Sequence, residues 1–484
     1  MEGADVMGLF KEYDIRGIYG SELNEDFAYN LGKTIISYTK AKSVVIGYDP
    51  RNGNLKLFSA IAKAITESGI NVTHAGLITR PMLNWIAWKH KFDLGIIITA
   101  SHNPREYNGF KFVWHASPLN YTNGLNDVES LMEKNAEYKK STKLVKNSKE
   151  RNGKIVSHDY VDDYVDFLSL HLSKDFNKYA KKFNVKIVGD ASNGAAGEII
   201  KRFFKKNNID SELLFSDPDG RFPCHNPNPL DNSSMIVLSQ EIIKRSFDFG
   251  FIVDPDGDRI RFADDKGTIV ENNYVDCLII KYLLKQHKKA SIVHDLISRK
   301  ILSETITKNG GRSISSKVGT SNIIQNMISN HAIFGCEMSG HRYYGVMNNF
   351  DSGMMTLVQF INTLYCHSDH AEHDFSRLWK KFDKYIDLGE LNYKFDNDSK
   401  KKMVLDNILK HCKRNKKKLK IKRINTIDGI TAQATNYWFN IRPSNTEPLL
   451  RLRIEGRKEK ILLKIKKDLE KQINNVAKNT LSRK

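Results

Sequence analysis

The sequence predicts an α/β protein in which short buried strands alternate with helices, arranged in several domains. The chain has 484 residues, which is too long for one compact hydrophobic core and is typical of two to four domains. Over roughly the first 300 residues, short apolar runs rich in β-branched residues alternate with amphipathic stretches and polar loops. This order is the one expected of parallel α/β layers.

Four apolar runs are predicted to be buried strands, because each is short and continuous. They are residues 44–48, 94–98, 185–189 and 249–253. After the first run, residues 57–68 carry apolar side chains at helical spacing, and Gly69 follows as a stop signal, so a helix is predicted there. Ligands bind at the carboxyl ends of parallel strands, so the loops after these strands are where a site is expected.

Three interruptions divide this alternation. They are the lysine-rich residues 138–155, the expected hairpin turn at 264–267, and the polar stretch at 367–390. Residues 458–478 are predicted to form an amphipathic helix whose apolar stripe packs against a core.

Composition excludes several classes of protein. Hydrophobic residues make up 40% and charged residues 27%, as in globular rather than disordered or fibrous chains. No apolar run approaches the roughly 20 residues that span a bilayer, and the acidic N-terminus is unlike a signal peptide. We therefore expect a cytoplasmic protein without membrane contact. Five scattered cysteines with no CxxC pair predict free thiols rather than disulfides or structural zinc.

The positive charge is concentrated near the C-terminus. The net charge is +20, and residues 400–484 hold 25 Lys and Arg against 7 Asp and Glu. A solvated lysine-rich surface is the favoured interpretation, because residues 400–423 have few aromatic side chains to stack on bases and match no nucleic-acid module. A basic nucleic-acid-binding protein acting through residues 400–484 is the alternative from another class.

The first candidate loop, residues 99–104, follows the 94–98 strand. A strand-end turn presents the Ser101 hydroxyl outward, and nearby backbone N–H groups can hold a phosphate. His102 and Lys111 could supply acid and base help to a serine that carries phosphate. The alternative is an ordinary turn or helix cap, where serine is common.

The second candidate loop, residues 254–259, follows the 249–253 strand. Asp254, Asp256 and Asp258 alternate within it and offer hard oxygen ligands of the kind that Mg²⁺ takes. The pattern is not that of an EF-hand. Three clustered acids repel one another unless a cation or solvent relieves them, so a cation site is favoured over a turn that is merely rich in Asp and Gly.

The third candidate loop, residues 335–341, places Glu337, Ser339 and His341 at alternate positions. Carboxylate, hydroxyl and imidazole groups suit vicinal sugar hydroxyls. A Ser-His hydrolase is a competing interpretation, but the loop lacks the GxSxG elbow. A plain glycine-rich turn also fits.

The fourth candidate loop, residues 442–447, is a possible phosphate cradle. Its polar side chains are those of Arg442, Ser444, Asn445 and Thr446. A proline-containing turn, with Arg451 and Arg453 on one face of the next strand, is the alternative. Taken together, the four loops suit a phosphorylated polyol and phosphoryl transfer to and from a serine with a divalent cation.

These motifs, in this order, resemble those of the α-D-phosphohexomutases, most closely the bacterial phosphomannomutase/phosphoglucomutase branch. The resemblance spans nearly the whole chain and rests on residues 13–17 (YDIRG), 99–104 (TASHNP), 108–111 (NGFK), 254–259 (DPDGDR), 335–341 (GCEMSGH) and 442–448 (RPSNTEP). It implies four domains around a central cleft, namely three related α/β units with mixed sheets and a smaller C-terminal α+β domain. The expected ranges are 1–155, 156–268, 269–383 and 384–484.

The resemblance also implies roles for individual residues. Ser101 would be the phosphoserine, and Mg²⁺ would be bound by its phosphate and by Asp254, Asp256 and Asp258. The phosphate would be surrounded by Arg16, His102, Lys111 and Arg259, with Lys111, His102 and His341 as candidates for the acid/base. Substrate contacts would come from Tyr13, Lys317, Glu337, Ser339, His341, Arg442, Ser444, Asn445, Thr446 and Arg451.

The implied reaction moves phosphate reversibly between C1 and C6 of a hexose, mannose first and glucose second, with a hexose 1,6-bisphosphate as intermediate and activator. Phosphoglucosamine mutase is the alternative, and Met338 and Asn445 favour the mannose/glucose type. The expected partner is a small phosphosugar, without nucleic acid, and the chain is expected to be a monomer or weak homodimer. Arg80 stands inside the usual Thr-Pro pair, and Gly319-Thr320 replaces a common Gly-His pair.

Overall fold

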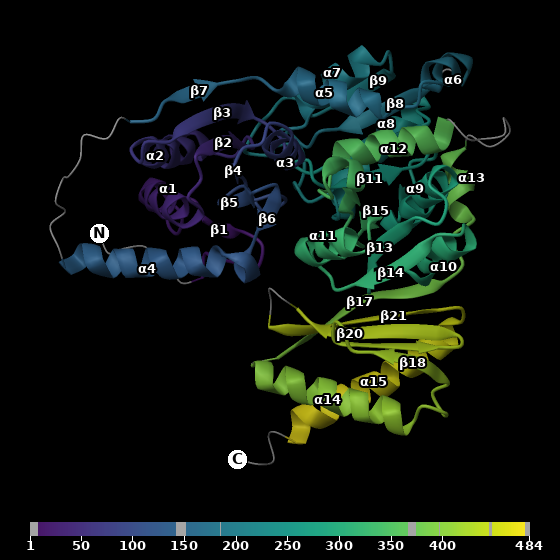
Figure 1. The fold of residues 1–484 in the computed structure, drawn as a ribbon. Coiled ribbons are helices and arrows are strands. Elements are labelled where there is room, and N and C mark those ends of the chain that lie inside the picture. Colours follow the sequence, from purple (N-terminus) through teal and green to yellow (C-terminus); the bar gives the residue numbers. More distant parts are fainter. Residues whose placement is uncertain are drawn as a thin grey trace.

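The structure is a computed structural model that describes residues 8–141, 152–183, 185–365, 374–395, 397–444 and 448–479. Within these ranges the strands form four sheets, each with helices packed on it (Figure 1). We call the four sheets with their helices the first to fourth units. No helix in the described ranges is long and apolar enough to cross a membrane.

The first unit has a seven-stranded sheet in the order β1-β5-β4-β2-β3-β7, with β6 beside β5. Strands β4, β2, β3 and β7 are parallel, whereas β5 is antiparallel to both β4 and β1. The elements are β1 (Ile15–Ile18), α1 (Glu25–Thr39), β2 (Ser43–Tyr48), α2 (Asn54–Thr66), β3 (Asn71–Leu77), α3 (Arg80–Lys89), β4 (Leu94–Ile98), β5 (Tyr107–Trp114), β6 (Ser117–Leu119), η1 (Tyr121–Asn123), α4 (Leu125–Ser141) and β7 (Ile155–Ser157).

The second unit has a five-stranded sheet in the order β12-β11-β10-β8-β9, and the third a four-stranded sheet in the order β14-β13-β15-β16. The second contains α5 (Val161–Leu170), α6 (Phe176–Phe183), β8 (Lys186–Asp190), α7 (Gly197–Lys206), β9 (Asp210–Leu214), η2 (Asn232–Met235), α8 (Ile236–Arg245), β10 (Phe249–Val253), β11 (Ile260–Ala263) and β12 (Ile269–Val270). The third contains α9 (Asn272–Gln286), β13 (Ser291–Asp295), α10 (Lys300–Lys308), β14 (Arg312–Ser316), α11 (Thr320–Ser329), β15 (Ala332–Cys336), β16 (Arg342–Tyr344), η3 (Gly345–Met347), α12 (Gly353–Tyr365) and α13 (Phe375–Lys380).

The first three units repeat one arrangement. In each, a central strand (β2, β8 or β13) is flanked by two strands parallel to it. The later of the two flanking strands (β4, β10 or β15) is followed by a short loop and by a strand that returns antiparallel to it. A loop this short can only join antiparallel neighbours, because a parallel connection needs a crossover of a dozen or more residues. The repeat therefore places a tight loop at the carboxyl end of the corresponding strand, β4, β10 or β15, in each of the three sheets.

The fourth unit is a five-stranded antiparallel sheet in the order β17-β21-β20-β19-β18. Its elements are β17 (Ile386–Lys394), α14 (Asp398–Arg414), β18 (Ile421–Asn425), β19 (Ile430–Ala434), β20 (Tyr437–Pro443), β21 (Leu449–Gly456) and α15 (Glu459–Asn479). Figure 1 shows both helices on the side of this sheet that faces away from the third unit. Helix α14 buries Val404, Ile408 and Cys412 together with Lys401, whereas Lys402 and Lys410 are exposed. Most of its basic residues therefore lie on a solvated face.

The predicted mixed α/β architecture with a different C-terminal sheet is confirmed. Two predicted strands, 94–98 and 249–253, agree with β4 and β10, and the predicted 264–267 turn connects β11 and β12. The helix predicted at 57–68 is found at 54–66: it begins at Asn54, directly after Gly53, and ends two residues before the predicted end. The cysteines in the described ranges are free thiols, as predicted; Cys366 lies outside those ranges.

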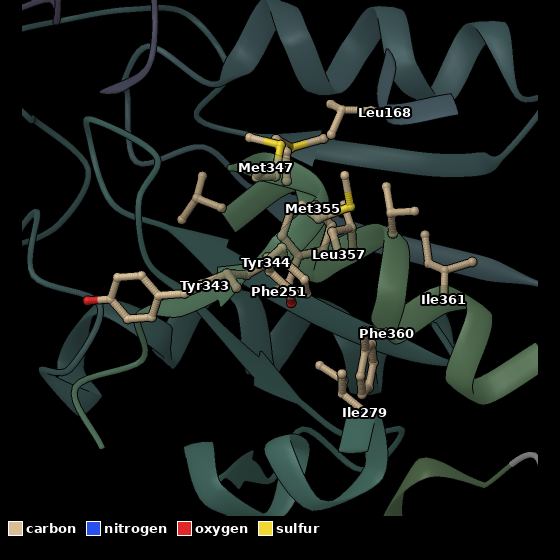
Figure 2. Packing of buried hydrophobic residues seen from close by; sticks show 14 of the residues in the cluster. Leu168, Phe251, Ile279, Tyr343, Tyr344, Met347, Met355, Leu357, Phe360 and Ile361 are labelled. Atoms are coloured by element: carbon tan, nitrogen blue, oxygen red, sulfur yellow. The ribbon is translucent and has the colours of Figure 1, made fainter. Parts of the chain in front are cut away.

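A continuous hydrophobic cluster connects the first three units. It includes Trp85 of α3, Tyr164 of α5 and Phe334 of β15. Figure 2 shows part of it, with Phe251 and Phe360 among side chains that converge from β10, β16, α9 and α12. The fourth unit has a separate cluster built on its own sheet and helices. The first three units therefore form one packed body, and the fourth attaches to it through other contacts.

Candidate active site

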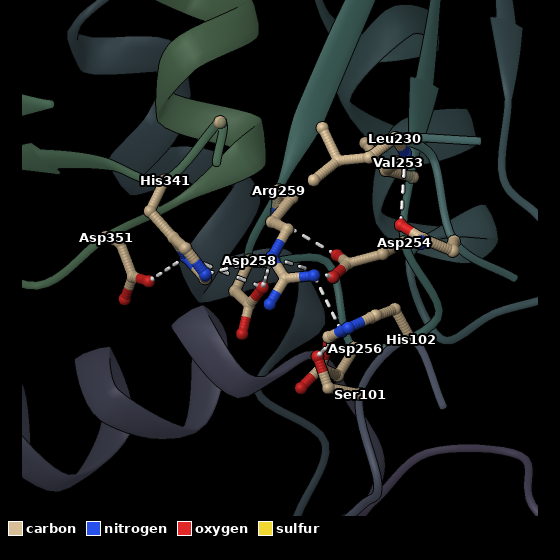
Figure 3. A network of polar contacts seen from close by, with 12 residues as sticks. Ser101, His102, Leu230, Val253, Asp254, Asp256, Asp258, Arg259, His341 and Asp351 are labelled. Atoms are coloured by element: carbon tan, nitrogen blue, oxygen red, sulfur yellow. Dashed lines mark hydrogen bonds and ion pairs between the residues drawn. The ribbon is translucent and has the colours of Figure 1, made fainter. Parts of the chain in front are cut away.

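The three tight loops of the repeated units lie next to one another. Residues 99–106 connect β4 to β5, residues 254–259 connect β10 to β11, and residues 337–341 connect β15 to β16. Arg259 and His341 form an isolated antiparallel bridge between the second and third loops. Figure 3 shows side chains from all three loops meeting at one place. The repeat thus assembles one site from three segments, of which the first and the third are more than 200 residues apart in the sequence.

Ser101 occupies a strained turn at the end of β4. Its φ is +54° and the residue is 1% exposed. A left-handed conformation is uncommon for a residue other than glycine and needs support from its surroundings. The Ser101 N–H donates to Thr99 Oγ1 at 2.8 Å, and Ser101 Oγ lies 3.3 Å from His102 Nδ1. The serine hydroxyl is therefore held at the wall of the site beside an imidazole.

His102 is partly buried and lies beside two arginines. Its Nδ1 lies 2.6 Å from Arg259 Nη1. Burial, and then the charges of Arg259 and Arg16, hold the pKa of His102 far below its usual range. A neutral imidazole accepts the guanidinium N–H through its Nδ1 lone pair, so it has no proton at that nitrogen to donate.

Each acid of the second loop has one carboxylate oxygen bound by a protein donor. Asp254 Oδ1 accepts the Arg259 N–H at 3.0 Å, Asp256 Oδ2 accepts from Lys111 Nζ at 3.0 Å, and Asp258 Oδ2 accepts from Arg80 Nε at 2.7 Å. The other oxygens, Asp254 Oδ2, Asp256 Oδ1 and Asp258 Oδ1, are buried and take no hydrogen bond from the described residues.

This division of oxygens fits a divalent cation. One ligand atom from each acid can be chosen so that all three lie within 4.8 Å of one another. Hard carboxylate oxygens, one from each of a few acids, are what Mg²⁺ takes when phosphate and water complete its shell. A buried carboxylate oxygen without a donor is costly, and a cation would relieve that cost.

The surroundings shift the pKa values of Asp254 and Asp258 in opposite directions. Burial, and then the neighbouring Asp258 and Asp256, hold the pKa of Asp254 well above its usual range. Burial would also raise the pKa of Asp258, but Arg80 and Lys111 hold it well below that range. The cations around Asp258 therefore favour its ionised form.

Arg80 and Asp351 belong to the same network, although sequence reasoning gave neither a role. The Arg80 guanidinium bonds Asp258 of the second unit and Asp351 of the third. Asp351 Oδ2 lies 2.7 Å from His341 Nδ1, and Arg259 Nε donates to His341 Nε2 at 2.9 Å. Arg80 is the first residue of α3, after Thr79, whose side chain caps the helix. The sequence signal for Arg80 was its position between Thr79 and Pro81, where the resemblance leads one to expect a Thr-Pro pair.

A cavity of about 830 Å³ opens in front of this network. Among the predicted site residues, its walls include Tyr13, Arg16, Ser101, Lys111, Asp258, Arg259 and His341. Tyr13 packs so closely on the third unit that a Cβ at Gly319 would lie 2.1 Å from its hydroxyl oxygen. The cavity is therefore bounded by both the first and the third units.

The other predicted substrate contacts lie away from this cavity. Glu337 is buried, and its oxygens accept from the Gly319 N–H and the Tyr343 hydroxyl, both at 2.6 Å. Ser339 is half-buried and Lys317 is exposed. None of these three lines the cavity in the described structure.

The fourth loop is described only in part. Arg442 and Ser444 are buried at the end of β20, and Arg451 of β21 pairs with Glu390 at 3.0 Å. Asn445 and Thr446 lie outside the described residues. The Arg442, Ser444 and Arg451 side chains are not part of the 830 Å³ cavity wall.

An aspartate at the end of the first strand supports the tight loop in each repeat. Asp49 Oδ2 accepts from the Thr99 hydroxyl at 2.6 Å, and Asp295 Oδ2 accepts the Met338 N–H at 2.9 Å. In the second unit, Asp190 accepts the Ser192 N–H, and the Ser192 hydroxyl donates to Val253 O at 2.6 Å. Sequence reasoning missed these acids, although each ends or directly follows a buried strand.

Family models match all four units. They are the phosphoglucomutase/phosphomannomutase α/β/α domain I at residues 7–139, domain II at 162–267, domain III at 271–385 and the C-terminal domain at 390–472. The chain is 34% identical to a phosphomannomutase of Methanocaldococcus jannaschii over 98% of each chain. It is 31% identical to a phosphomannomutase of Escherichia coli K12 over 93% of this chain and 94% of that one.

Solved structures share the fold. A phosphoglucomutase/phosphomannomutase family protein of Burkholderia thailandensis superposes with a TM-score of 0.83 at 24% identity, covering 97% of each chain. An open form of Paramecium parafusin, a phosphoglucomutase, superposes with a TM-score of 0.77 at 16% identity, over 99% of this chain and 96% of that one. The chain belongs to the phosphoglucomutase/phosphomannomutase family and is a phosphomutase, an isomerase.

Proposed function

We propose that the chain moves phosphate reversibly between C1 and C6 of a hexose through a phosphoserine at Ser101. The observation that carries this proposal is the placement of one buried serine hydroxyl beside three acids and at least three cationic side chains. Phosphoryl transfer needs positioning and charge neutralisation more than covalent help from the protein, and this site supplies both.

The residues around Ser101 would share the work as follows. The undonated oxygens of Asp254, Asp256 and Asp258 would hold Mg²⁺, which supplies charge neutralisation and polarises the transferring phosphoryl group. Lys111 and Arg259 reach the same place from the first and second units. Their fixed positive charges would stabilise the equatorial phosphoryl oxygens, with Arg16 contributing from the cavity wall.

The proposed reaction has two transfers. In the first, a free sugar hydroxyl attacks phospho-Ser101: the serine O–P bond breaks, a sugar O–P bond forms, and a hexose 1,6-bisphosphate results. The bisphosphate then reorients in the cavity so that its other phosphoryl group faces Ser101. The serine hydroxyl attacks that group, the sugar O–P bond breaks, and Ser101 is phosphorylated again. Lys111 and His341 line the cavity and are the acid/base candidates. A neutral His341 would take the proton from the attacking hydroxyl, and Lys111 could do so only after losing its own proton.

The remaining predicted residues would hold the far end of the substrate. Arg442, Ser444, Asn445, Thr446 and Arg451 would bind the distal phosphate, because Arg and hydroxyl groups suit phosphate oxygens. Glu337 and Ser339 would contact sugar hydroxyls, with Tyr13 and Lys317 beside them. Among these residues Tyr13 lines the cavity, whereas the described side chains of Lys317, Glu337, Ser339, Arg442, Ser444 and Arg451 do not. Binding would therefore have to bring the third and fourth loops towards the cavity.

The names and complexes of relatives support the choice of ligands. The curated relatives above are phosphomannomutases, which favours mannose phosphates. An Aspergillus fumigatus N-acetylphosphoglucosamine mutase of the same fold was solved with glucose 1,6-bisphosphate, and again with GlcNAc-6P and magnesium. We therefore propose Mg²⁺ as the cofactor and a hexose 1,6-bisphosphate as the activator.

Coupled assays test the substrate. With Mg²⁺ and glucose 1,6-bisphosphate present, we expect kcat/KM to be highest for mannose 1-phosphate, followed by glucose 1-phosphate. A clear preference for glucosamine 1-phosphate would instead identify a phosphoglucosamine mutase. Absence of turnover on all three, with the protein folded and loaded with Mg²⁺, would contradict the proposed reaction.

A further inference from the structure

Arg51 is buried directly beneath the Ser101 loop. It follows β2, and its side chain is 0% exposed. Its guanidinium donates to three backbone carbonyl oxygens of the loop, those of Ser101 (2.6 Å), Asn103 (2.6 Å) and Pro104 (2.7 Å), and to that of Tyr107 at the start of β5 (3.1 Å). A planar guanidinium offers five donors in a fixed geometry, so it fixes the path of this backbone.

Asp49 connects Arg51 to the other side of Ser101. Arg51 Nε lies 3.2 Å from Asp49 Oδ2, and the same oxygen accepts from the Thr99 hydroxyl at 2.6 Å. Thr99 Oγ1 in turn accepts the Ser101 N–H. Ser101 is therefore held at its carbonyl by Arg51 and at its amide by the Asp49–Thr99 pair.

These bonds offset a strained backbone. Ser101 has a φ of +54°, which L residues other than Asn and Asp seldom adopt. If the carbonyl bonds were lost, the residue would relax toward negative φ. Because Oγ is attached to the same Cα, that rotation would move the hydroxyl relative to the three acids of the second unit.

The second unit closes over Arg51 from the opposite side. The guanidinium carbon lies 5.0 Å from the centroid of the Phe222 ring. Phe222 is itself buried and left-handed, with a φ of +47°. At Gly220 a Cβ would lie 2.3 Å from Pro50 O. Residues 220–222 of the second unit therefore pack closely against this face of the first unit. The second unit also carries the Asp254–Asp258 loop.

We propose that Arg51 is a positioning residue for phosphoryl transfer. It holds Ser101 in the left-handed turn and, through Phe222, holds the serine loop in register with the acids of the second unit. Arg51 has no surface in the cavity and acts on the reaction only through Ser101. The inference rests on the proposed role of Ser101 as the phosphoserine.

The test separates positioning from substrate binding. In Arg51→Ala we expect kcat to fall about 100-fold or more, because a misplacement of about 1 Å can cost that much, while KM for the hexose phosphate changes less than about threefold. Rapid-quench measurement of phosphoryl transfer from the enzyme to the sugar should show the same fall. Guanidinium ion should restore part of kcat in Arg51→Ala, and Arg51→Lys should be intermediate, because an ammonium group cannot reach four carbonyl groups at once.

Arg261→Ala is the matched control. Arg261 also donates to loop acceptors, Pro229 O, Leu230 O and Asn232 Oδ1, but lies outside the site. Its loss should leave kcat within about twofold, with no response to guanidinium ion. Phe222→Leu keeps apolar bulk but removes the ring, and should lower kcat less than Arg51→Ala does. If Arg51→Ala does not fold, Arg51→Lys and Phe222→Leu provide the same comparison.

Two outcomes overturn the inference. One is a folded Arg51 variant with kcat near that of the wild type. The other is a rise in KM with an unchanged rate of transfer from Ser101, which would make Arg51 a substrate-binding residue. Failure of the proposed function would look different, because the wild-type chain itself would then carry no phosphate on Ser101.

Discussion

Asp254, Asp256 and Asp258 show how single atoms define the proposed cation site. In each acid one oxygen receives a protein donor, and the other takes no hydrogen bond from the described residues. A turn that was merely rich in Asp would expose both oxygens to solvent, whereas these side chains are buried. The pattern therefore favours the cation site that the spacing of the three acids predicted.

Asp256→Asn tests this arrangement. The amide keeps the size of the side chain but removes one negative charge from the cation ligands, so the affinity for the cation should fall about tenfold or more. Titration with Mn²⁺ followed by electron paramagnetic resonance measures this directly. Asp166→Asn, which alters an exposed acid paired with Lys206, should leave the affinity unchanged. Equal affinities in the two variants would contradict the assignment.

Arg80→Met tests the arginine that joins Asp258 to Asp351. Its loss leaves Asp258 and Asp351, which are both buried, without the cation that they share. Asp351, which also bonds His341, would then be held less firmly. Removing a residue that orients metal ligands typically costs about 10–100-fold in activity or metal affinity, and we expect a fall of that size in kcat at saturating Mg²⁺. Arg202→Met removes a half-buried arginine that has acidic partners but lies outside the site, and it should have no effect on kcat. A normal kcat in Arg80→Met would show that the pairing does not matter.

At the scale of elements, two predicted strands, β4 and β10, agree with the structure in both bounds because each is a continuous apolar run that is buried on both faces. β4 and β10 are buried at every position, so their hydrophobicity marks both ends. The helix predicted at 57–68 begins three residues earlier, at Asn54. The three residues before Leu57 are Asn54, which is buried but polar, Leu55, which is 61% exposed, and Lys56. They form no apolar stripe that a periodicity argument could detect.

The supporting side chains could not be predicted in the same way. Arg80 and Asp351 are 271 positions apart in the sequence, and Arg51 meets Phe222 only where the first and second units dock. Local periodicity contains no information about which faces of two units come together. The site motifs were visible because they are dense in polar groups, whereas Asp49 and Arg51 look like an ordinary loop after a strand.

Gly257→Ala tests the close fit between the second loop and α3. Gly257 has a φ of +70°, and a Cβ there would lie 2.7 Å from Thr79 Cγ2. Gly310 has a φ of +78° but open space around it, so Gly310→Ala measures the conformational cost alone, about 1–2 kcal/mol. We expect Gly257→Ala to lower the free energy of unfolding further, as measured by urea denaturation. Equal losses would mean that the loop shifts without strain.

On the scale of the whole molecule, the fourth unit differs from the other three in how it is attached. The first three share one hydrophobic cluster, whereas the fourth has its own. A buried carboxylate, Glu455 of β21, joins it to the third unit. Glu455 accepts from Arg299 Nε at 2.9 Å, the Lys300 N–H at 2.9 Å and Trp438 Nε1 at 2.5 Å. This junction positions the sheet that carries Arg442.

Glu455→Gln should loosen that junction. Removing the charge leaves Arg299 buried without its anionic partner, a change that typically costs about 3–5 kcal/mol. Calorimetry should show the fourth unit unfolding at a lower temperature than the rest, and KM should rise because the proposed distal-phosphate groups lie on this unit. Glu198→Gln, at an exposed ion pair, should change neither. A single unfolding transition at the wild-type temperature would contradict this account of the junction.

The central claim is that Ser101 carries the phosphoryl group. The most direct measurement is intact-protein mass before and after incubation with glucose 1,6-bisphosphate and Mg²⁺, followed by mapping of the modified peptide. The account predicts a gain of one phosphoryl group on the peptide that contains Ser101, and no gain and almost no turnover in Ser101→Ala. Normal turnover in Ser101→Ala, or a label that maps to another residue, would contradict it.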